Sequence, residues 1–224
     1  MRSGIGKSGQ RKGRTFTETA RRAQIMAAAI DTIAELGYGQ ASLARIAERA
    51  GTSKGVICYH FDGKDDLVRE LVAELSAKGR AYLAPRLEAE PTGAGMLRAY
   101  IESNLAFVGE NRNHVLATVE VALNARGTDG SPLYDFAARE SGVAALQRIL
   151  ARFQGTGEFR GDFDPLVMAT AIRAALDAVP ARLARDPGLD LGHYGRELAG
   201  LFDLATRAAE PAAAGSGAAR PAVR

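Results

Sequence analysis

Two short helices joined by a glycine turn are predicted between residues 42 and 64 of this 224-residue chain. Leu43, Ile46 and Ala50 are spaced so that their side chains form one buried stripe on a two-turn helix. Ser42 precedes this stripe as its N-cap, and Gly51 follows it, where a sharp turn often needs a positive φ. Apolar spacing and turn residues therefore agree on where one helix ends and the next begins.

The second helix has two apolar anchors, Ile57 and Phe61, one turn apart. Thr52 and Ser53 supply side-chain oxygens that can cap its first turn. The remaining residues are expected to face outward: Lys54, Gly55, Val56, Cys58, Tyr59 and His60. Such a helix must dock on its neighbours and offer its other face to a partner, and the major groove of B-DNA is wide enough to admit it. We therefore interpret the pair as a DNA-binding helix-turn-helix, with a plain helical hairpin as the alternative.

Positive charge is concentrated in the same part of the chain. Residues 1–66 contain 11 Lys or Arg against 7 Asp or Glu, whereas residues 67–224 contain 18 against 19. Five of the basic residues lie within residues 1–16, a segment with several Gly and Ser and no acidic residue. Such a segment is expected to be disordered in isolation and attracted to phosphate. The charge distribution favours DNA binding over the plain hairpin.

Composition limits the remaining possibilities. A hydrophobic content of 46% suffices for a real core, and no apolar run is long enough to span a membrane. The basic N-terminal segment has no apolar stretch behind it, so we expect no signal peptide and a cytoplasmic protein. The single cysteine, Cys58, excludes an intramolecular disulfide, and no Cys and His residues have metal-binding spacing. Neither a metal site nor a cofactor is expected.

Every periodic segment is typical of helix and no strand pattern is found, which predicts an all-α fold of about nine helices. Besides the helix-turn-helix, the expected helices are 18–36, 64–82, 95–110, 114–125, 131–154, 165–184 and 191–208. Asp164 and Pro165 are suited to open the sixth of these, and Pro180 is expected to kink or shorten it. The predicted parts are a disordered basic arm (1–16), a three-helix head (17–63), a larger helical body (64–209) and a disordered tail (210–224).

The stretch AGTSKGVICYHFDGKDDLV resembles the signature of the TetR family of bacterial transcriptional regulators, in which a Ser-Lys-Gly turn leads into the recognition helix and a Lys begins the fourth helix. The resemblance spans roughly residues 18–75, and GEFRGDFDPLVMATAIRAALDAVPARL is similar to the family's entry into its eighth helix. It implies a homodimer that binds a palindromic operator, usually as a repressor. It also implies that residues 64–209 form a ligand-binding and dimerisation domain, and that an unknown small-molecule effector filling its pocket releases the DNA.

The resemblance further implies which residues meet the DNA. The positions that match the family's contacts are Ser53, Lys54, Gly55, Val56, Tyr59 and His60, with Lys64 as a phosphate ligand at the start of the fourth helix. Ser42, Arg45, Thr52 and Cys58 complete the predicted DNA-binding set. Cys58 stands where the family usually has Tyr, so the contact expected there is absent or much smaller. No second His lies near His60 in sequence, which favours DNA contact for it.

Two other functions remain open. A thiol at Cys58, near Lys54 and a helix end, could be activated, so that its oxidation on the DNA-binding face would release the operator. The simpler alternative for Cys58 is a small side chain that fills its position. A non-specific DNA-binding protein is the other possibility, but it leaves the near-neutral helical body unexplained. An enzyme is not expected, because the sequence has no nucleophile elbow, paired carboxylates, phosphate-binding glycine loop or metal set.

Two polar residues of the body, Asn104 and Glu120, lie on otherwise apolar helical stripes. A buried amide or carboxylate needs a partner, which is either an effector's polar group or another side chain of the protein. The predicted ligand-binding residues are Tyr100, Asn104, Phe107, Glu120 and Tyr134, although the aromatic members could equally belong to the core.

The helices expected at 165–184 and 191–208 carry more apolar area than the outer helices of a monomer require. Four such helices from two subunits would form a bundle, which predicts a dimer interface made by Ile172, Leu176, Val179, Tyr194, Leu198, Leu201 and Phe202. Arg173 and Asp177 are one turn apart and are expected to pair on the surface or across this interface.

Overall fold

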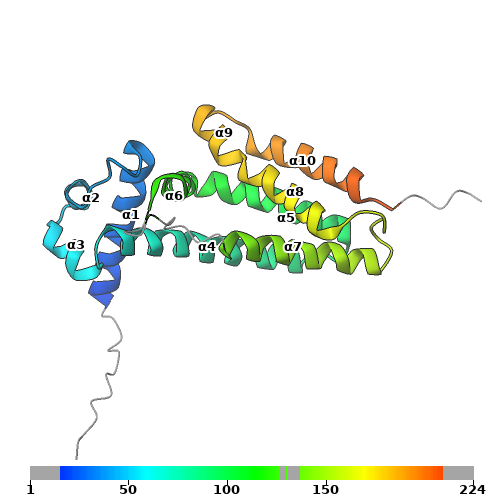
Figure 1. Ribbon diagram of the computed structural model, residues 1–224, viewed down its shortest axis with the longest axis horizontal. Helices are drawn as coiled ribbons and strands as arrows, with labels where there is room; N and C mark the ends of the chain where they lie inside the picture. Colours follow the sequence, from blue (N-terminus) through cyan, green and yellow to red (C-terminus); the bar gives the residue numbers. More distant parts are fainter. Residues whose placement is uncertain (1–15, 127–129, 131–136, 209–224) are drawn as a thin grey trace, which may run out of the picture. The chain divides into compact units, whose positions relative to one another are not determined.

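The computed structural model describes residues 16–126, 130 and 137–208, and the regular secondary structure in these ranges is α-helical, which confirms the all-α prediction (Figure 1). The helices are α1 (Phe16–Leu36), α2 (Leu43–Arg49), α3 (Lys54–His60), α4 (Lys64–Glu88), α5 (Gly93–Glu110), α6 (Arg112–Asn124), α7 (Ala137–Gly155), α8 (Pro165–Asp177), α9 (Val179–Arg185) and α10 (Leu191–Thr206). Within these ranges no helix is long and apolar enough to cross a membrane. The predicted arm up to residue 15 and the tail from residue 210 lie outside the described residues.

The chain divides into two compact units. Of the described residues, the head unit comprises 16–77, 111–126 and 130, and the body unit comprises 78–110 and 137–208. The head unit therefore holds α1, α2, α3, the first half of α4 and also α6. This division differs from the sequence-based one at residue 63, because α6 packs on α1 and the start of α4 contributes to the head core.

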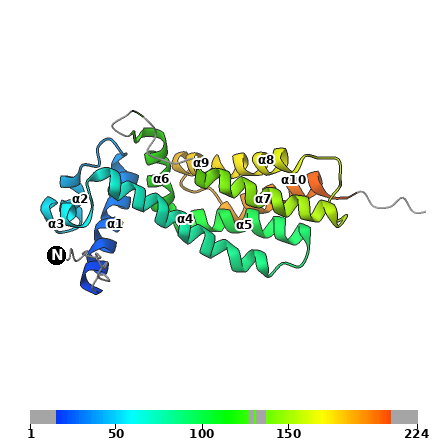
Figure 2. The same cartoon turned by 60° about the horizontal axis from the view of Figure 1, so that its bottom comes forward.

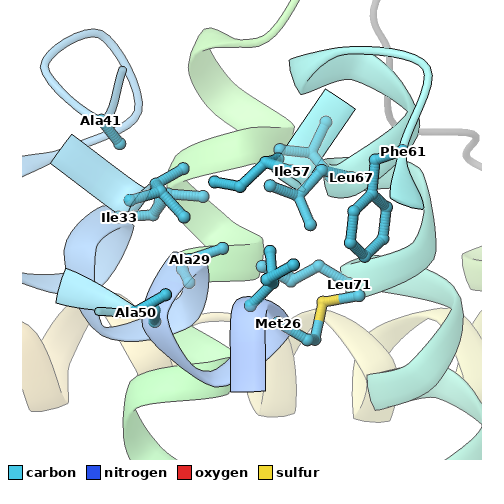
Figure 3. Close-up of a cluster of buried hydrophobic side chains, with 14 of the residues drawn as sticks. Met26, Ala29, Ile33, Ala41, Ala50, Ile57, Phe61, Leu67 and Leu71 are labelled. Atoms are coloured by element: carbon cyan, nitrogen blue, oxygen red, sulfur yellow. The ribbon is translucent and has the colours of Figure 1, made fainter. Parts of the chain in front are cut away.

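The core of the head unit is built around α1 (Figure 3). Ile25, Ala29 and Ile33 recur on one face of this helix and are each fully buried. Ile57 of α3 and the adjoining Phe61 are 0% and 2% exposed, which confirms both anchors of the second helix. The start of α4 adds Leu67, Val68 and Leu71, and α6 adds Ala117 and Val121.

The turns of the head unit follow the sequence signals. The Ser42 hydroxyl accepts a hydrogen bond from the backbone N–H of Arg45 at 3.3 Å, and the Ser53 hydroxyl accepts one from Val56 at 3.3 Å. Gly51 has a φ of +60°, a conformation that glycine adopts without strain because it has no Cβ. These contacts confirm the predicted N-caps of α2 and α3 and the turn between them.

In the body unit, α5 packs along α10 and α7 packs along α8 (Figure 2). Their shared core contains Leu97, Ile101, Leu105, Leu146, Leu150 and Ile172, each less than 2% exposed. Asp164 caps α8, because its Oδ1 accepts hydrogen bonds from the backbone N–H groups of Leu166 and Val167 at 2.7 and 3.2 Å. The predicted effect of Pro180 is confirmed, since α8 ends at Asp177 and a separate α9 starts at Val179.

Candidate nucleic-acid interface

The outer face of α3 is largely free of contacts with the rest of the head unit. Lys54, Gly55 and Cys58 are exposed, and the Tyr59 side chain is 76% exposed. His60 is half-buried, and its ring meets that of Tyr59 edge-on with centroids 5.1 Å apart. Val56, which the sequence placed on the outer face, is instead half-buried and packs against the head core. The exposed surface of α3 is therefore made by polar, aromatic and small side chains.

Gly55 leaves room for a partner near the start of α3. A Cβ added at this position would meet Ser53 Oγ at 3.7 Å, which is an ordinary van der Waals distance. Packing within the head unit therefore does not require glycine at position 55. The small residue lets a group from outside come close to the backbone at the start of the helix.

The predicted residues before α3 also lie at the surface. Ser42 and Arg45 are exposed on α2, where Arg45 Nη1 donates hydrogen bonds to the backbone O of Gln40 at 3.2 Å and to its Oε1 at 3.4 Å. Ser53 is exposed and Thr52 is half-buried. These residues and the exposed residues of α3 reach solvent, as DNA contact requires, while Ile46, Ala50 and Ile57 between them are buried.

Lys64 does not extend into solvent as a phosphate ligand would. Its Nζ donates a hydrogen bond to the backbone O of Tyr38 at 2.5 Å and lies 3.8 Å from the centroid of the Tyr38 ring. Burial lowers the pKa of Lys64, and the neighbouring Asp65 carboxylate offsets part of this effect. In this arrangement Lys64 ties the start of α4 to the turn between α1 and α2.

Arg22 of α1 was not predicted as a functional residue, yet it touches the end of α3. Its guanidinium is buried and donates to the backbone O of His60 and to the carboxylate of Glu70. A sequence signal for it exists, because Arg22 precedes Met26 and Ala29 at i+4 and i+7 and so shares their buried stripe. A charged residue on such a stripe needs a partner, but the partners are 38 and 48 positions away in sequence.

Glu120 belongs to the head unit rather than to a pocket of the body. It lies on α6, where its Oε2 accepts hydrogen bonds from the backbone N–H of Tyr38 at 3.3 Å and from Asn124 Nδ2 at 3.1 Å. A Cβ added at Gly37 would lie 3.3 Å from the same oxygen, and Gly37 has a φ of +77°. The structure thus separates Glu120 from the other predicted ligand-binding residues and gives it a structural partner.

The remaining predicted ligand-binding residues lie on α5, apart from Tyr134, which falls outside the described residues. Asn104 Nδ2 donates to the backbone O of Tyr100 at 2.7 Å, and Asn104 Oδ1 accepts from Arg173 Nη1 at 3.3 Å. Arg173 also donates to the Tyr100 hydroxyl at 3.3 Å and to Asp177 Oδ1 at 2.6 Å. The predicted pairing of Arg173 with Asp177 is confirmed, but the pair packs on α5 inside the body unit.

Phe107 is also packed within the body unit. Its ring centroid lies 5.5 Å from that of Tyr82, and a Cβ added at Gly79 would lie 3.5 Å from the same ring. A separate open cavity of about 650 Å³ lies between the end of α4 and the start of α5. Its walls include Arg86, Glu90, Thr92, Arg98 and Glu102 and none of the predicted ligand-binding residues.

The predicted dimer interface requires a correction. Ile172, Leu176, Val179 and Phe202 are 0%, 3%, 0% and 7% exposed, because they fill the body unit's own core. Tyr194 and Leu198 are half-buried against the same core, whereas Leu201 is 61% exposed. Other large apolar side chains of α8 and α10 lie on the surface: Leu166 and Val167 on α8, and Leu204 on α10.

Known proteins are similar in sequence to the part of this chain that contains α1, α2 and α3. The model of the tetR family of bacterial regulatory proteins matches residues 25–71. The HTH-type transcriptional regulator BetI of Escherichia coli O45:K1 (strain S88) is 35% identical over 81 residues, which cover 36% of this chain and 42% of BetI. The chain thus aligns with less than half the length of this relative.

Solved structures match over most of the chain at low identity. FadR from Bacillus subtilis, in complex with stearoyl-CoA, is 21% identical with a TM-score of 0.67, and the match covers 80% of this chain and 96% of FadR. SmeT in complex with triclosan is 20% identical with a TM-score of 0.68 over 84% of this chain and 92% of SmeT, the repressor of the Stenotrophomonas maltophilia multidrug efflux pump SmeDEF. These matches show a shared fold. In sequence, the helix-turn-helix segment of the chain is thus similar to that of the tetR family of bacterial regulatory proteins.

Proposed function

We propose that this protein is a repressor that binds a palindromic operator as a homodimer and leaves the DNA when a small molecule binds the body unit. The observation that carries the proposal is the outer face of α3, where Lys54, Cys58 and Tyr59 are exposed while Ile57 anchors the helix in the head core. A helix held in this way can enter the major groove without losing its packing.

The DNA contacts are assigned by position along α3. Tyr59 and His60 have rings that can reach base edges, and Tyr59 is the more exposed of the two. Ser53, Lys54 and the backbone of Gly55 lie at the start of the helix, where hydroxyl, ammonium and N–H groups suit phosphate oxygens. Base contacts from the last turn would specify the sequence, and phosphate contacts from the first turn would hold the helix in register.

The dimer is assigned to the exposed faces of α8 and α10. Leu166 and Val167 on α8 are 47% and 66% exposed, and Leu201 and Leu204 on α10 are 61% and 71% exposed. Large apolar side chains left exposed on two helices of the same unit are typical of a surface that another protein covers. A second copy that presents the same face would bury them in a four-helix interface, and the two-fold symmetry would match a palindromic operator.

The effector is assigned to the body unit. Two proteins of similar fold have been solved with small molecules, FadR with stearoyl-CoA and SmeT with triclosan. The cavity of about 650 Å³ in this body unit lies within the usual size range of small-molecule sites. The polar cluster of Tyr100, Asn104 and Arg173 is a weaker candidate, because its groups already bond to one another.

The proposal is tested by selecting duplexes from a random pool with the purified protein and measuring affinity for the selected and the scrambled sequence. We expect an inverted repeat whose half-sites are about one helical turn apart and a specific affinity at least about 10³-fold above that for scrambled DNA. Equal affinity for all duplexes would instead indicate a non-specific DNA-binding protein. The variant Cys58→Ser tests the redox alternative, in which oxidation of Cys58 releases the operator. We expect peroxide to leave the operator affinity of both the wild type and the variant unchanged.

A further inference from the structure

The C-terminal end of the recognition helix α3 is held by a side chain from α1. Arg22 is 8% exposed, and its Nη1 donates a hydrogen bond to the backbone O of His60, the last residue of α3. The guanidinium carbon also lies 3.9 Å from the ring centroid of Phe61, the residue that follows. Arg22 therefore contacts both the residue that ends α3 and the one that leads the chain away from it.

Glu70 of α4 fixes the orientation of the same guanidinium. Arg22 Nε donates to Glu70 Oε1 at 3.3 Å, and Arg22 Nη2 donates to Glu70 Oε2. Two parallel bonds between a planar guanidinium and a carboxylate leave the pair little rotational freedom. One buried group thus joins α1, the end of α3 and α4.

This connection matters because α3 has few other contacts that fix its direction. The helix has seven residues, and its buried side chain is Ile57, with Val56 half-buried beside it. The last carbonyls of a helix have no donor within the helix, and a basic group there also complements the helix dipole. The Ser53 cap holds the first turn, and Arg22 holds the last.

We propose that Arg22 is a positioning residue for operator recognition, which sets the direction of the last turn of α3 through the His60 carbonyl and the Phe61 ring. The proposal rests on the proposed function of α3. Tyr59 and His60 lie in this last turn, so a rotation there moves their rings relative to the base edges. The first turn, with the phosphate-binding groups, keeps its place. Sequence discrimination is therefore more sensitive to Arg22 than affinity for DNA in general.

The variant Arg22→Lys keeps the charge but cannot reproduce the planar fork that contacts Glu70 and the His60 carbonyl together. A cavity of about 180 Å³ beside Arg22, which Thr19, Ala23 and Met26 also line, accommodates the changed side chain without overpacking. The matched control is Arg21→Lys. Arg21 is the neighbouring residue on α1 and makes a surface hydrogen bond to Gln24 at 2.8 Å.

The first measurement compares affinity for a duplex that the wild-type protein selects from a random pool with affinity for its scrambled version. Arg22→Lys should bind the selected duplex about tenfold more weakly, the loss typical of a disrupted charged hydrogen bond. Its affinity for scrambled DNA should stay within about twofold of wild type, with the same salt dependence, because the net charge is unchanged. Arg21→Lys should stay within about twofold on both duplexes.

The second measurement reports the position of α3 without DNA. Cys58 is the single cysteine of the chain and is exposed on α3, so a nitroxide attached to it labels the recognition helix selectively. In the free full-length protein, Arg22→Lys should make the nitroxide more mobile, whereas Arg21→Lys should leave its spectrum unchanged. A wild-type protein that selects no duplex would refute the proposed function, and the nitroxide spectra would still decide whether Arg22 positions α3.

Three results would overturn the positioning role: equal losses in Arg22→Lys and Arg21→Lys, equal losses of Arg22→Lys on both duplexes, or an unchanged nitroxide spectrum in Arg22→Lys. If Arg22→Lys does not fold, Glu70→Gln replaces it, since Arg22 then keeps its length and loses its charged partner. We expect about a threefold loss on the selected duplex and a more mobile nitroxide for Glu70→Gln. Wild-type values in both measurements would exclude the positioning role.

Discussion

Tyr59 is the large side chain of α3 that solvent reaches most freely, with 76% of it exposed. We predict that Tyr59→Ala weakens operator binding by about 1–3 kcal/mol, because an exposed ring contributes to the groove contact and not to the core. The unfolding temperature should stay near that of wild type, and titration of the selected duplex followed by thermal unfolding measures both. The variant Tyr59→Phe removes only the hydroxyl, so it separates the contribution of the ring to DNA affinity from that of the hydroxyl. A fall in unfolding temperature with unchanged DNA affinity would place Tyr59 in the fold instead.

Lys54 and Lys64 should behave differently although both are lysines near the DNA-binding face. Lys54 is exposed, so Lys54→Ala should lower the slope of log affinity against log salt by about 0.9 without changing the unfolding temperature. Lys64→Ala removes the partner of the Tyr38 carbonyl and should lower the unfolding temperature by several degrees. If Lys64→Ala instead matches Lys54→Ala in both measurements, the Lys64 side chain binds a phosphate in the complex.

A site residue is identified from sequence when its role follows from its own helix, and one such as Arg22 is missed because its partners are distant in sequence. The exposed side chains of α3 follow from its own short pattern, since its two apolar anchors leave the other positions outside, with Val56 as the exception. Arg22 acts through His60 and Glu70, and the chain brings these three together only when α1, α3 and α4 pack. Glu120 was misplaced for the same reason, because its partner Tyr38 lies 82 positions away.

Among the helices, α10 offers a test of pH dependence. Asp190 caps it by accepting a hydrogen bond from the backbone N–H of His193 at 2.9 Å, and this bond lowers the Asp190 pKa below its usual value of 3.8. A carboxyl whose pKa is lower in the folded state stabilises the fold above its unfolded pKa and loses this effect as the pH falls through the folded value. Asp190→Asn keeps a good N-cap that does not titrate.

We therefore predict that wild type and Asp190→Asn differ by a constant free energy of unfolding above about pH 5, and that the difference shrinks below pH 3.8. Urea unfolding at a series of pH values measures it. A difference that stays the same down to pH 3 would mean that the charged form of Asp190 adds nothing to the cap.

Element boundaries were predictable from sequence where local chemistry sets them. Ser42, Ser53 and Asp164 cap helices as expected, and Pro180 separates α8 from α9. The inward face of α8 was not predictable in the same way, because apolar residues occur on more than one side of this helix. Periodicity identifies an apolar face but does not say whether the same subunit or another one covers it.

For the whole molecule, the dimer surface proposed on α8 and α10 gives two substitutions with different outcomes. Leu201 is 61% exposed, so Leu201→Glu should leave the subunit folded and split the dimer, because a carboxylate is costly in an apolar interface. Leu176 is 3% exposed in the body core, so Leu176→Glu should unfold the subunit at a cost of several kcal/mol. Sedimentation gives the mass, and circular dichroism gives the helix content.

The folded monomer of Leu201→Glu should also bind its operator weakly, since a palindromic site gains affinity from two linked heads. Leu123→Glu is a suitable control, because Leu123 on α6 is 65% exposed outside α8 and α10. It should remain a dimer. If Leu201→Glu also remains a dimer, the interface lies elsewhere on the chain.

The place of α6 in the head unit limits how such a protein can be recombined with its relatives. A crossover after residue 77 would transfer α1, α2 and α3 but would replace α6, whose Ala117, Val121 and Ala125 fill the head core and whose Glu120 holds the Tyr38 backbone. The transferred α1 would then face a foreign helix, and a cavity or a clash there would destabilise the recognition surface. A chimaera that keeps its DNA specificity has to inherit residues 111–126 together with the N-terminal segment, so these two distant stretches should exchange as a pair.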